Sequence, residues 1–168
     1  MDYSPLMLIG ILSDTHDHAE AARAAVQVLR GRGAEYFIHC GDVGGEAVLD
    51  QLAGLPAAFV WGNNDWDRVA LAKYAEKIGL NCYGSFADLS LGGKKFAVIH
   101  GDDTRLKRRL LEEQRHDYLL QGHTHVPNDV RVGKVRVINP GALHRANPKT
   151  VALLDTENDA LEWVEMAF

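Results

Sequence analysis

The stretch LMLIGILSDTH, residues 6–16, joins a nearly continuous apolar run to an abrupt polar end. Such a run is typical of a strand that is buried on both faces. Asp14 and His16 come directly after it. In open α/β sheets, ligand-binding side chains collect at the carboxyl ends of strands. The stretch therefore predicts the first strand of an α/β fold and a candidate site at its end.

The first half of the chain alternates between strand-like and helical patterns. The predicted elements are a helix over 18–30, strands over 35–39 and 57–61 with a short helix between them, and a further helix over 67–78. The Ala-rich helix is bounded by Gly31 and Gly33. Strands that alternate with helices favour parallel pairing.

The second half is richer in predicted hairpins. Two strand-like runs meet at Gly92-Gly93, two more meet at Gly133-Lys134, and a third pair lies within 150–166. A helix over 104–115 and a strand over 116–122 are expected between the first two. These patterns leave open one mixed sheet or two packed sheets flanked by helices, in a single domain over residues 1–168.

Composition limits the classes of partner. The net charge is −5, and no long basic cluster is present, so strong nucleic-acid binding is not expected. Cys40 and Cys82 are the only cysteines, which favours a reducing compartment. The amino-terminal stretch carries no basic leader, and no segment is long and apolar enough to span a bilayer. We therefore expect a cytoplasmic protein without a membrane partner.

Potential metal ligands follow five predicted strands. They are Asp14 and His16 in SDTH, Asp42 in GDV, Asn63 in GNND, His100 in HGD, and His123 and His125 in GHTH. Each alone has an ordinary alternative as a helix cap, a turn residue or a hydrogen-bonded polar side chain. In an extended segment Asp14 and His16 would lie on one side, and a divalent metal would remove the repulsion within HTH. Taken together, the five strand ends indicate a shared metal site.

The five blocks DTH, GDV, GNND, HGD and GHTHVP, in this order, resemble those of the calcineurin-like metallophosphoesterases. The HCGD form, the short length and the NPGA stretch at 139–142 resemble the small YfcE-type phosphodiesterases. The resemblance covers nearly the whole chain, from about Ile9 to the last hairpin. It implies a four-layer α/β/β/α sandwich with a two-metal centre in a cleft at the sheet ends.

The resemblance also implies a role for each matching residue. Asp14, His16 and His125 would hold one metal, Asn63, His100 and His123 the other, and Asp42 would bridge both and position the attacking hydroxide. From the residues themselves rather than the resemblance, Asn63 and Asn64 are expected to contact the substrate phosphate, and His39 and Asp65 to support the ligands beside which they stand. Mn²⁺ is expected first by resemblance, and Fe, Zn²⁺, Ni²⁺ or Co²⁺ also suit oxygen and imidazole ligands.

The chain departs from the larger family at Asn64, where many members have a histidine. An amide can donate a hydrogen bond to phosphate, but it cannot act as a general acid near neutral pH. The small YfcE-type proteins lack this histidine too. We therefore expect a preference for esters with good leaving groups.

The resulting prediction is a metal-dependent phosphodiesterase that acts on small phosphate esters. A phosphomonoesterase or nucleotidase is the alternative within the enzyme class. A non-catalytic scaffold, like the retromer subunit that shares this fold, is the alternative outside it; retention of all seven ligands argues against that. A homodimer is expected as a further option because the late hairpins offer free edges.

Several other residues carry weaker expectations. His116 is expected to be solvated. Trp61 and Trp66 are expected to lie in the core, with a wall of the substrate pocket as the alternative. His18 would either cap the helix that follows it or reach substrate. His144 and Arg145 are expected at the surface, with a position facing the cleft as the alternative.

Overall fold

The computed structural model describes residues 6–168; residues 1–5 of the predicted domain lie outside the described residues. The helices are α1 (Ala19–Gly31), α2 (Glu46–Leu49), α3 (Arg68–Lys77) and α4 (Thr104–Glu113). The strands are β1 (Leu8–Leu12), β2 (Tyr36–His39), β3 (Ala57–Phe59), β4 (Asn81–Cys82), β5 (Phe86–Leu91), β6 (Lys94–Ile99), β7 (Tyr118–Leu120), β8 (Asn128–Val132), β9 (Val135–Asn139), β10 (Lys149–Asp155) and β11 (Ala160–Met166).

The strands form two sheets. One has six strands in the order β11-β10-β1-β2-β3-β4, and the other has five in the order β5-β6-β7-β9-β8. Strands β1 to β4 pair in parallel, as do β6, β7 and β9. The pairs β5–β6, β8–β9 and β10–β11 are antiparallel, which confirms the three predicted hairpins. Of the two architectures left open by the sequence, the molecule has two sheets.

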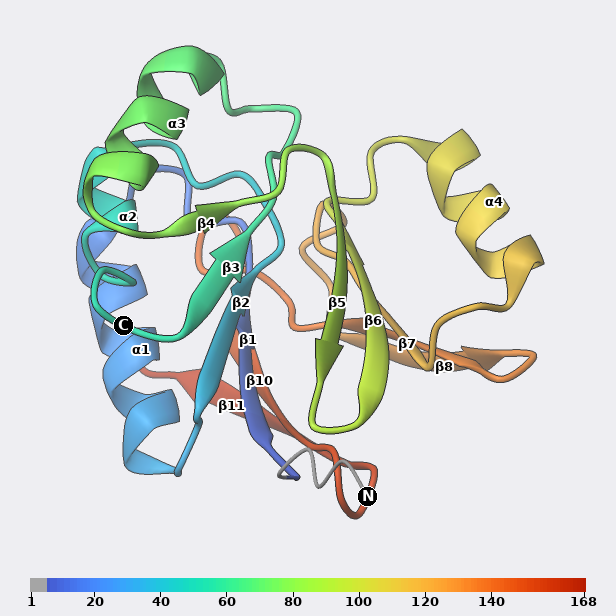
Figure 1. The fold of residues 1–168 in the computed structure, drawn as a ribbon. Helices are drawn as coiled ribbons and strands as arrows, with labels where there is room; N and C mark the ends of the chain where they lie inside the picture. The colour runs from blue at the N-terminus through green and yellow to red at the C-terminus, as the bar shows by residue number, and fades with distance from the viewer. Residues whose placement is uncertain (1–5) are drawn as a thin grey trace.

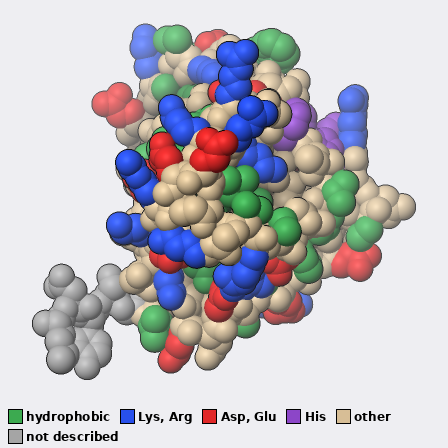
Figure 2. Space-filling view, turned by 90° about the vertical axis from the view of Figure 1, so that its right-hand side faces the viewer, with side chains coloured by type: hydrophobic (Ala, Val, Ile, Leu, Met, Phe, Trp, Pro, Cys, Tyr) green, Lys and Arg blue, Asp and Glu red, His purple; other side chains and the backbone are tan. Residues whose placement is uncertain are grey.

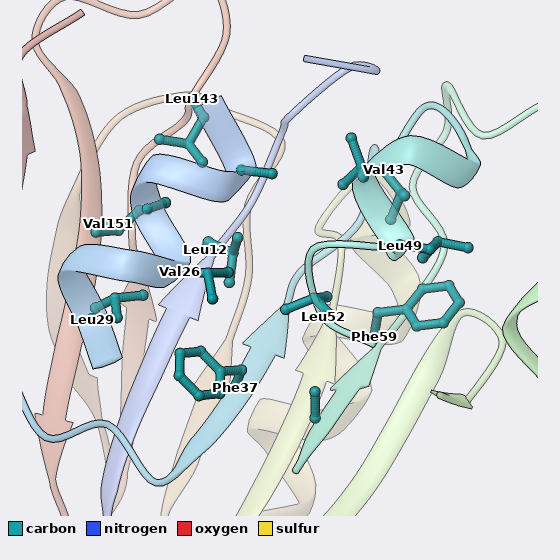
Figure 3. Close-up of a cluster of buried hydrophobic side chains, with 14 of the residues drawn as sticks. Leu12, Val26, Leu29, Phe37, Val43, Leu49, Leu52, Phe59, Leu143 and Val151 are labelled. Atoms are coloured by element: carbon teal, nitrogen blue, oxygen red, sulfur yellow. The ribbon is translucent and has the colours of Figure 1, made fainter. Parts of the chain in front are cut away.

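Four layers follow from the way these sheets are covered. Helices α1, α2 and α3 lie on the outer face of the six-stranded sheet, and α4 lies on the outer face of the five-stranded sheet (Figure 1). Leu12, Leu29, Phe37 and Phe59 pack between the first sheet and its helices (Figure 3). A second, mainly aliphatic cluster lies between the two sheets. A third cluster lies between the five-stranded sheet and α4, and it includes Leu110. The α/β/β/α sandwich is confirmed.

Strand β1 shows why its sequence is apolar throughout. Ile9 and Ile11 face the other sheet, whereas Leu12 faces the helices. Gly10 permits close packing of α1, because a Cβ there would lie 3.0 Å from Cδ1 of Leu29. Both faces of the strand are therefore buried, and its carboxyl end is fixed at the edge of the sheet.

Strand β4 was not expected from the sequence, because its two residues are too few to show a periodic hydrophobic pattern. No helix within residues 6–168 combines the length and hydrophobicity that a membrane crossing requires.

Candidate metal centre

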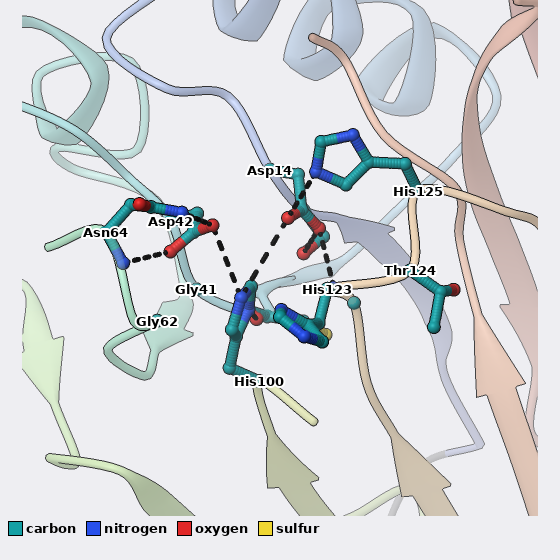
Figure 4. Close-up of polar contacts among 12 residues, drawn as sticks. Asp14, Gly41, Asp42, Gly62, Asn64, His100, His123, Thr124 and His125 are labelled. Atoms are coloured by element: carbon teal, nitrogen blue, oxygen red, sulfur yellow. Dashed lines mark hydrogen bonds and ion pairs between the residues drawn. The ribbon is translucent and has the colours of Figure 1, made fainter. Parts of the chain in front are cut away.

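The loops after four strands converge at one end of the two sheets. Asp14 follows β1, Asp42 follows β2, His100 follows β6, and His123 and His125 follow β7 (Figure 4). Parallel strands end at the same edge, so residues that are distant in sequence meet there.

Asp14 lies at the middle of this group. Its Oδ1 is 3.1 Å from Nε2 of His125, 3.8 Å from Nε2 of His16 and 3.9 Å from Nε2 of His100. Its Oδ2 accepts a hydrogen bond from the Ser13 hydroxyl at 2.6 Å. The carboxylate is completely buried, so one oxygen is anchored and the other faces three imidazoles.

Asp42 lies between two of the same imidazoles. Its Oδ2 is 3.3 Å from Nε2 of His16 and 3.3 Å from Nε2 of His100. Potential ligand atoms fall into two overlapping groups, one of Asp14, His16 and His125 and one of Asp14, Asp42 and His100. Asp14 belongs to both groups and Asp42 to the second only, although Asp42 also contacts His16 of the first, so the bridging role expected of Asp42 stays a prediction.

Several buried ligand atoms have no hydrogen-bond partner. Oδ1 of Asp14, Nε2 of His16 and Nε2 of His100 are all in this state within the described part of the chain. A buried polar atom without a partner costs about 1–3 kcal/mol, and such atoms are rare in folded proteins. Carboxylate oxygen and imidazole nitrogen are suitable donors for divalent transition metals. The residues present therefore fit a metal centre.

The HTH turn places its two imidazoles on opposite sides of this group. The His125 ring centroid lies 5.5 Å from that of His16, and the His123 ring centroid lies 5.1 Å from that of His100. The backbone N–H of His123 also donates to Oδ2 of Asp14 at 3.1 Å. Each imidazole thus neighbours a different candidate ligand histidine, and the division of His123 and His125 between two metals stays a prediction.

The asparagine pair of the GNND loop is divided between two environments. The backbone N–H of Asn64 donates to Oδ1 of Asp42 at 2.8 Å, and its side-chain amide donates to Oδ2 at 2.9 Å. Asn63 is exposed and forms no side-chain hydrogen bond among residues 6–168. Asn64 thus orients Asp42 directly, and the predicted metal contact of Asn63 stays a prediction.

The backbone of the site is largely left-handed. Asp14, His16, Asp42, His123 and His125 have φ values of 55°, 44°, 55°, 69° and 61°. This region is sparsely populated by non-glycine residues. The expectation that Asp14 and His16 lie in an extended segment is wrong, because two left-handed residues in a tight turn bring both side chains to the site.

Neighbouring glycines leave room for the carboxylates. A Cβ on Gly62 would lie 2.1 Å from Oδ1 of Asp42, and one on Gly122 would lie 2.4 Å from Oδ2 of Asp14. Both distances are far below van der Waals contact. The GNND and GHTH blocks therefore need their glycines as much as their ligands.

A layer of buried side chains ties the site loops together. The Asp65 carboxylate accepts from the backbone N–H groups of Gly44 at 2.9 Å and Gly62 at 2.8 Å. His39 lies 3.0 Å from the Thr15 hydroxyl through Nε2, and its Nδ1 accepts from the Gly41 N–H at 3.2 Å. Burial lowers the pKa of His39 to about 4, so it is neutral near pH 7.

Three supporting residues were missed by sequence reasoning. Ser13 anchors Asp14, Asn139 donates to the Gly122 carbonyl and the Thr124 hydroxyl, and Arg68 donates to the Gly62 and Asp65 carbonyls. Each lies in or beside a motif already noted, and adjacency was the only available signal. Ser13 and Arg68 bond within their own loops, and only Asn139 bonds to a loop that is distant in sequence.

The ionisable groups perturb one another. Burial alone would raise the pKa of Asp14, but contacts with His16, Ser13 and nearby imidazoles hold it below its usual value. Burial likewise opposes the shift at Asp42, where His100 and Asn64 keep the pKa low. Both carboxylates are therefore charged near neutral pH, and the pocket is prepared for cations.

Three expectations for neighbouring residues are wrong. His116 is 5% exposed rather than solvated, since α4 and β5 close around it. Trp61 lies in the core as expected, but Trp66 is 83% exposed. His144 is half-buried, with its ring centroid 5.0 Å from that of His16 and 4.4 Å from that of His18. His18 precedes α1 without a side-chain capping bond.

Comparison with known proteins agrees with this arrangement. The phosphodiesterase MJ0936 of Methanocaldococcus jannaschii is 33% identical over 156 residues, which cover 90% of this chain and 94% of that protein. The solved structure of a novel archaeal phosphodiesterase has a TM-score of 0.87 at 29% identity and covers 95% of this chain and 100% of that one. The phosphoesterase YfcE of E. coli shares the fold, with a TM-score of 0.66 at 18% identity over 96% of this chain and 100% of that one.

The family assignment rests on most of the chain. Residues 7–159 match the model of the calcineurin-like phosphoesterase superfamily domain, and this range includes the four loops that bring the candidate ligands together. The chain therefore belongs to the calcineurin-like phosphoesterase superfamily.

Proposed function

We propose that this protein hydrolyses small phosphodiesters with the aid of two divalent cations. The observation that carries the proposal is the convergence of buried, unpartnered ligand atoms on Asp14, His16 and His100. The carboxylates of Asp14 and Asp42 lie 3.3–3.9 Å from the Nε2 atoms of the histidines His16 and His100. They supply the negative charge that cations require. The similarity to phosphodiesterases supports phosphate diesters as the substrate class.

The chain's own residues divide the work between them. Asp14, His16 and His125 would hold one cation, while His100, His123 and Asn63 would hold the other. Asp42 would lie between the two cations, held in orientation by both donors of Asn64. When bound, the cations would neutralise phosphoryl oxygens and lower the pKa of an attacking water.

The side of the site that carries His123 is exposed, whereas Asp14 and Asp42 lie below the surface. A small ester could therefore place its phosphate at the ligands while its organic groups stay outside. Mn²⁺ is the proposed metal on the family resemblance, and the oxygen and imidazole ligands also suit Fe, Zn²⁺, Ni²⁺ or Co²⁺. Cys40 is buried outside the ligand groups and supplies no thiolate.

The test compares bis-p-nitrophenyl phosphate with p-nitrophenyl phosphate. The full chain is stripped with a chelator and supplied with Mn²⁺, and metal content is measured beside activity. We expect metal-dependent hydrolysis that favours the diester and two bound ions per chain. The variant Asp42→Asn should lose at least about 100-fold in kcat/KM, as expected for loss of transition-state electrostatics.

The matched control is Asp155→Asn, which changes the last residue of β10, whose carboxylate accepts from Glu157 and Asn158 in the following turn, and it should leave activity unchanged. Preference for the monoester would favour the phosphomonoesterase alternative. Failure to bind metal would overturn the proposed activity and favour a scaffold of the same fold.

An exposed edge supports the proposed homodimer. All five residues of β8 are exposed, including Val130 and Val132, and unpaired edge strands can extend a sheet into a second copy. Sedimentation equilibrium of the full chain tests this directly, and a monomer at micromolar concentration would contradict it.

A further inference from the structure

A second pocket lies on the outer face of the five-stranded sheet, away from the ligand-bearing loops. It has a volume of 570 Å³ and lies between β5 and α4. Alternate residues of β5 face opposite ways, so Ala87 and Leu89 pack between the sheets while Phe86 and Asp88 line the pocket. Helix α4 packs over β6, β7 and β9, and Phe86 at the start of β5 is half-buried against the same cluster.

The pocket is rich in cationic side chains. Lys95, Arg109 and Arg115 line it beside two carboxylates, those of Asp88 and Glu113. The three cations exceed the two carboxylates by one positive charge, whereas the whole chain has a net charge of −5. Figure 2, which faces this side of the molecule, shows many Lys and Arg side chains around exposed hydrophobic ones.

These cations are weakly neutralised. One carboxylate, that of Glu113, serves both Arg109 and Arg115, and each Nε···Oε distance is 3.9 Å. Lys95 takes part in no ion pair among the described residues. Exposed pairs at such distances contribute little energy, so the guanidinium groups can turn to another anion at small cost.

The wall of the pocket also contains a buried histidine. His116 is 5% exposed, and its Nε2 lies 3.1 Å from Oδ1 of Asp88. Its Nδ1 has no partner within residues 6–168. The neutral tautomer that donates from Nε2 to Asp88 avoids a buried N–H without an acceptor. Asp88 is thereby engaged by His116 instead of by the cations.

Aromatic surface lies beside these charges. The ring of His116 meets that of Phe86 edge to face at a centroid distance of 6.2 Å, and both rings line the pocket. A ligand that combines a phosphate with an apolar ring would match both parts of the pocket wall, the phosphate facing the cationic side chains and the ring facing Phe86 and His116. Guanidinium groups bind phosphate oxygens through paired N–H donors, and aromatic rings favour stacked or edge contacts.

We propose that this pocket binds a small organic phosphate, independently of the candidate metal centre. Arg109 and Arg115 contact the phosphate, Lys95 adds charge, and Phe86 with His116 receives the ring. The two sites share β6, because Phe86 pairs with Ile99 and the next residue is His100. The sites nevertheless contain different residues and can be observed separately.

The probe is phenyl phosphate, titrated into the ¹⁵N-labelled full chain in the presence of chelator, which prevents its hydrolysis at the metal centre. We expect saturable amide shifts at Phe86, Asp88 and His116. The double variant Arg109→Gln/Arg115→Gln should weaken binding by at least about fivefold, since charge-assisted hydrogen bonds to phosphate are lost. The matched control, Lys107→Gln/Arg108→Gln, removes the same charge from α4 outside the pocket and should change affinity less than about twofold.

Three outcomes would overturn the proposal. One is the absence of saturable shifts at the pocket, and another is shifts confined to the loops of Asp14 and His123. The third is equal weakening by both double variants, which indicates attraction to overall charge. Inorganic phosphate provides the remaining comparison: weaker binding than phenyl phosphate supports the aromatic half of the site, and equal binding contradicts it. Circular dichroism of each variant confirms that it is folded.

Discussion

His125 places its Nε2 only 3.1 Å from Oδ1 of Asp14, although the two residues follow different strands in different sheets. Their contact joins the sheets at the edge where the candidate ligands meet. A cation held between them would bind the folded state alone, since the unfolded chain does not bring these loops together. Metal binding should therefore stabilise the fold.

The first prediction concerns this stabilisation. Metal at 100 times its Kd should add about 2.7 kcal/mol to the free energy of unfolding, which raises Tm by about 5–10 °C in a chain of this size. Differential scanning calorimetry with Mn²⁺ and with chelator measures the shift. His125→Asn should reduce it, whereas His18→Asn, beside the site but outside the ligand groups, should preserve it. Equal Tm values with metal and chelator would contradict the centre.

The second prediction concerns the leaving group. Asn64 cannot protonate a departing oxygen near neutral pH, and general acid catalysis is worth about 10²–10⁴-fold. Diesters with alkyl leaving groups should therefore react slower than aryl diesters by a factor of this order. A series of substituted phenyl diesters gives the dependence of kcat on leaving-group pKa. Asn64→His should flatten this dependence, and a flat dependence in the unaltered protein would count against the idea.

The third prediction separates two neighbouring aspartates. Asp65 joins the Gly44 and Gly62 loops, so Asp65→Asn should destabilise the fold by about 1–3 kcal/mol and lower kcat/KM as well. Asp67 instead caps α3 by accepting from the Ala70 N–H, and Asp67→Ala should cost about 1 kcal/mol of stability without affecting kcat/KM. Urea unfolding and steady-state kinetics measure both quantities. Equal kinetic effects in the two variants would refute the distinction.

The fourth prediction is a pH dependence of stability. Arg136 donates to both carboxylate oxygens of Asp129 at 2.8 Å, which holds the pKa of Asp129 below its ordinary value of 3.8. The stabilisation from this pair is fully present above the pKa that Asp129 has in the unfolded chain. It is lost as the pH falls through the lower pKa that Asp129 has in the folded protein. Asp129→Asn should cost about 1–2 kcal/mol at pH 7 and lose less stability than the parent below pH of about 4.

Urea unfolding at a series of pH values between neutral and acid measures the Asp129 contribution. Asp102→Asn is the control, because Asp102 is exposed and takes part in no ion pair within the described part of the chain. Parallel stability curves for the parent and Asp129→Asn would contradict the assignment.

Much of the fold could be predicted because its signals are local. The apolar run of β1 is buried on both faces, and paired glycines mark the β5–β6 turn, so periodicity and turn chemistry sufficed there. Strand β4 could not be found in this way, because its two residues are held by pairing with β3 rather than by a pattern of their own.

The candidate site likewise contains some features that local sequence signals predict and others that only the fold determines. Residue type and position after a strand indicated Asp14 and His100, but no local pattern indicates left-handed turns or their partners. His116 illustrates the limit most clearly. Its burial depends on α4 and β5, which only the folded chain brings together, whereas its place just before a strand suggested a solvated position.

The left-handed backbone at five candidate ligands has a consequence for protein engineering. Such a conformation costs a non-glycine residue about 1–2 kcal/mol, so the turns hold their shape only because the surrounding fold enforces it. Transplanting the side chains of Asp14, Asp42 and His125 to matching strand ends of another sheet would place them on relaxed loops. A functional graft would have to carry the turns, Gly62, Gly122 and the Asp65 carboxylate with its bonds to the backbone as one unit.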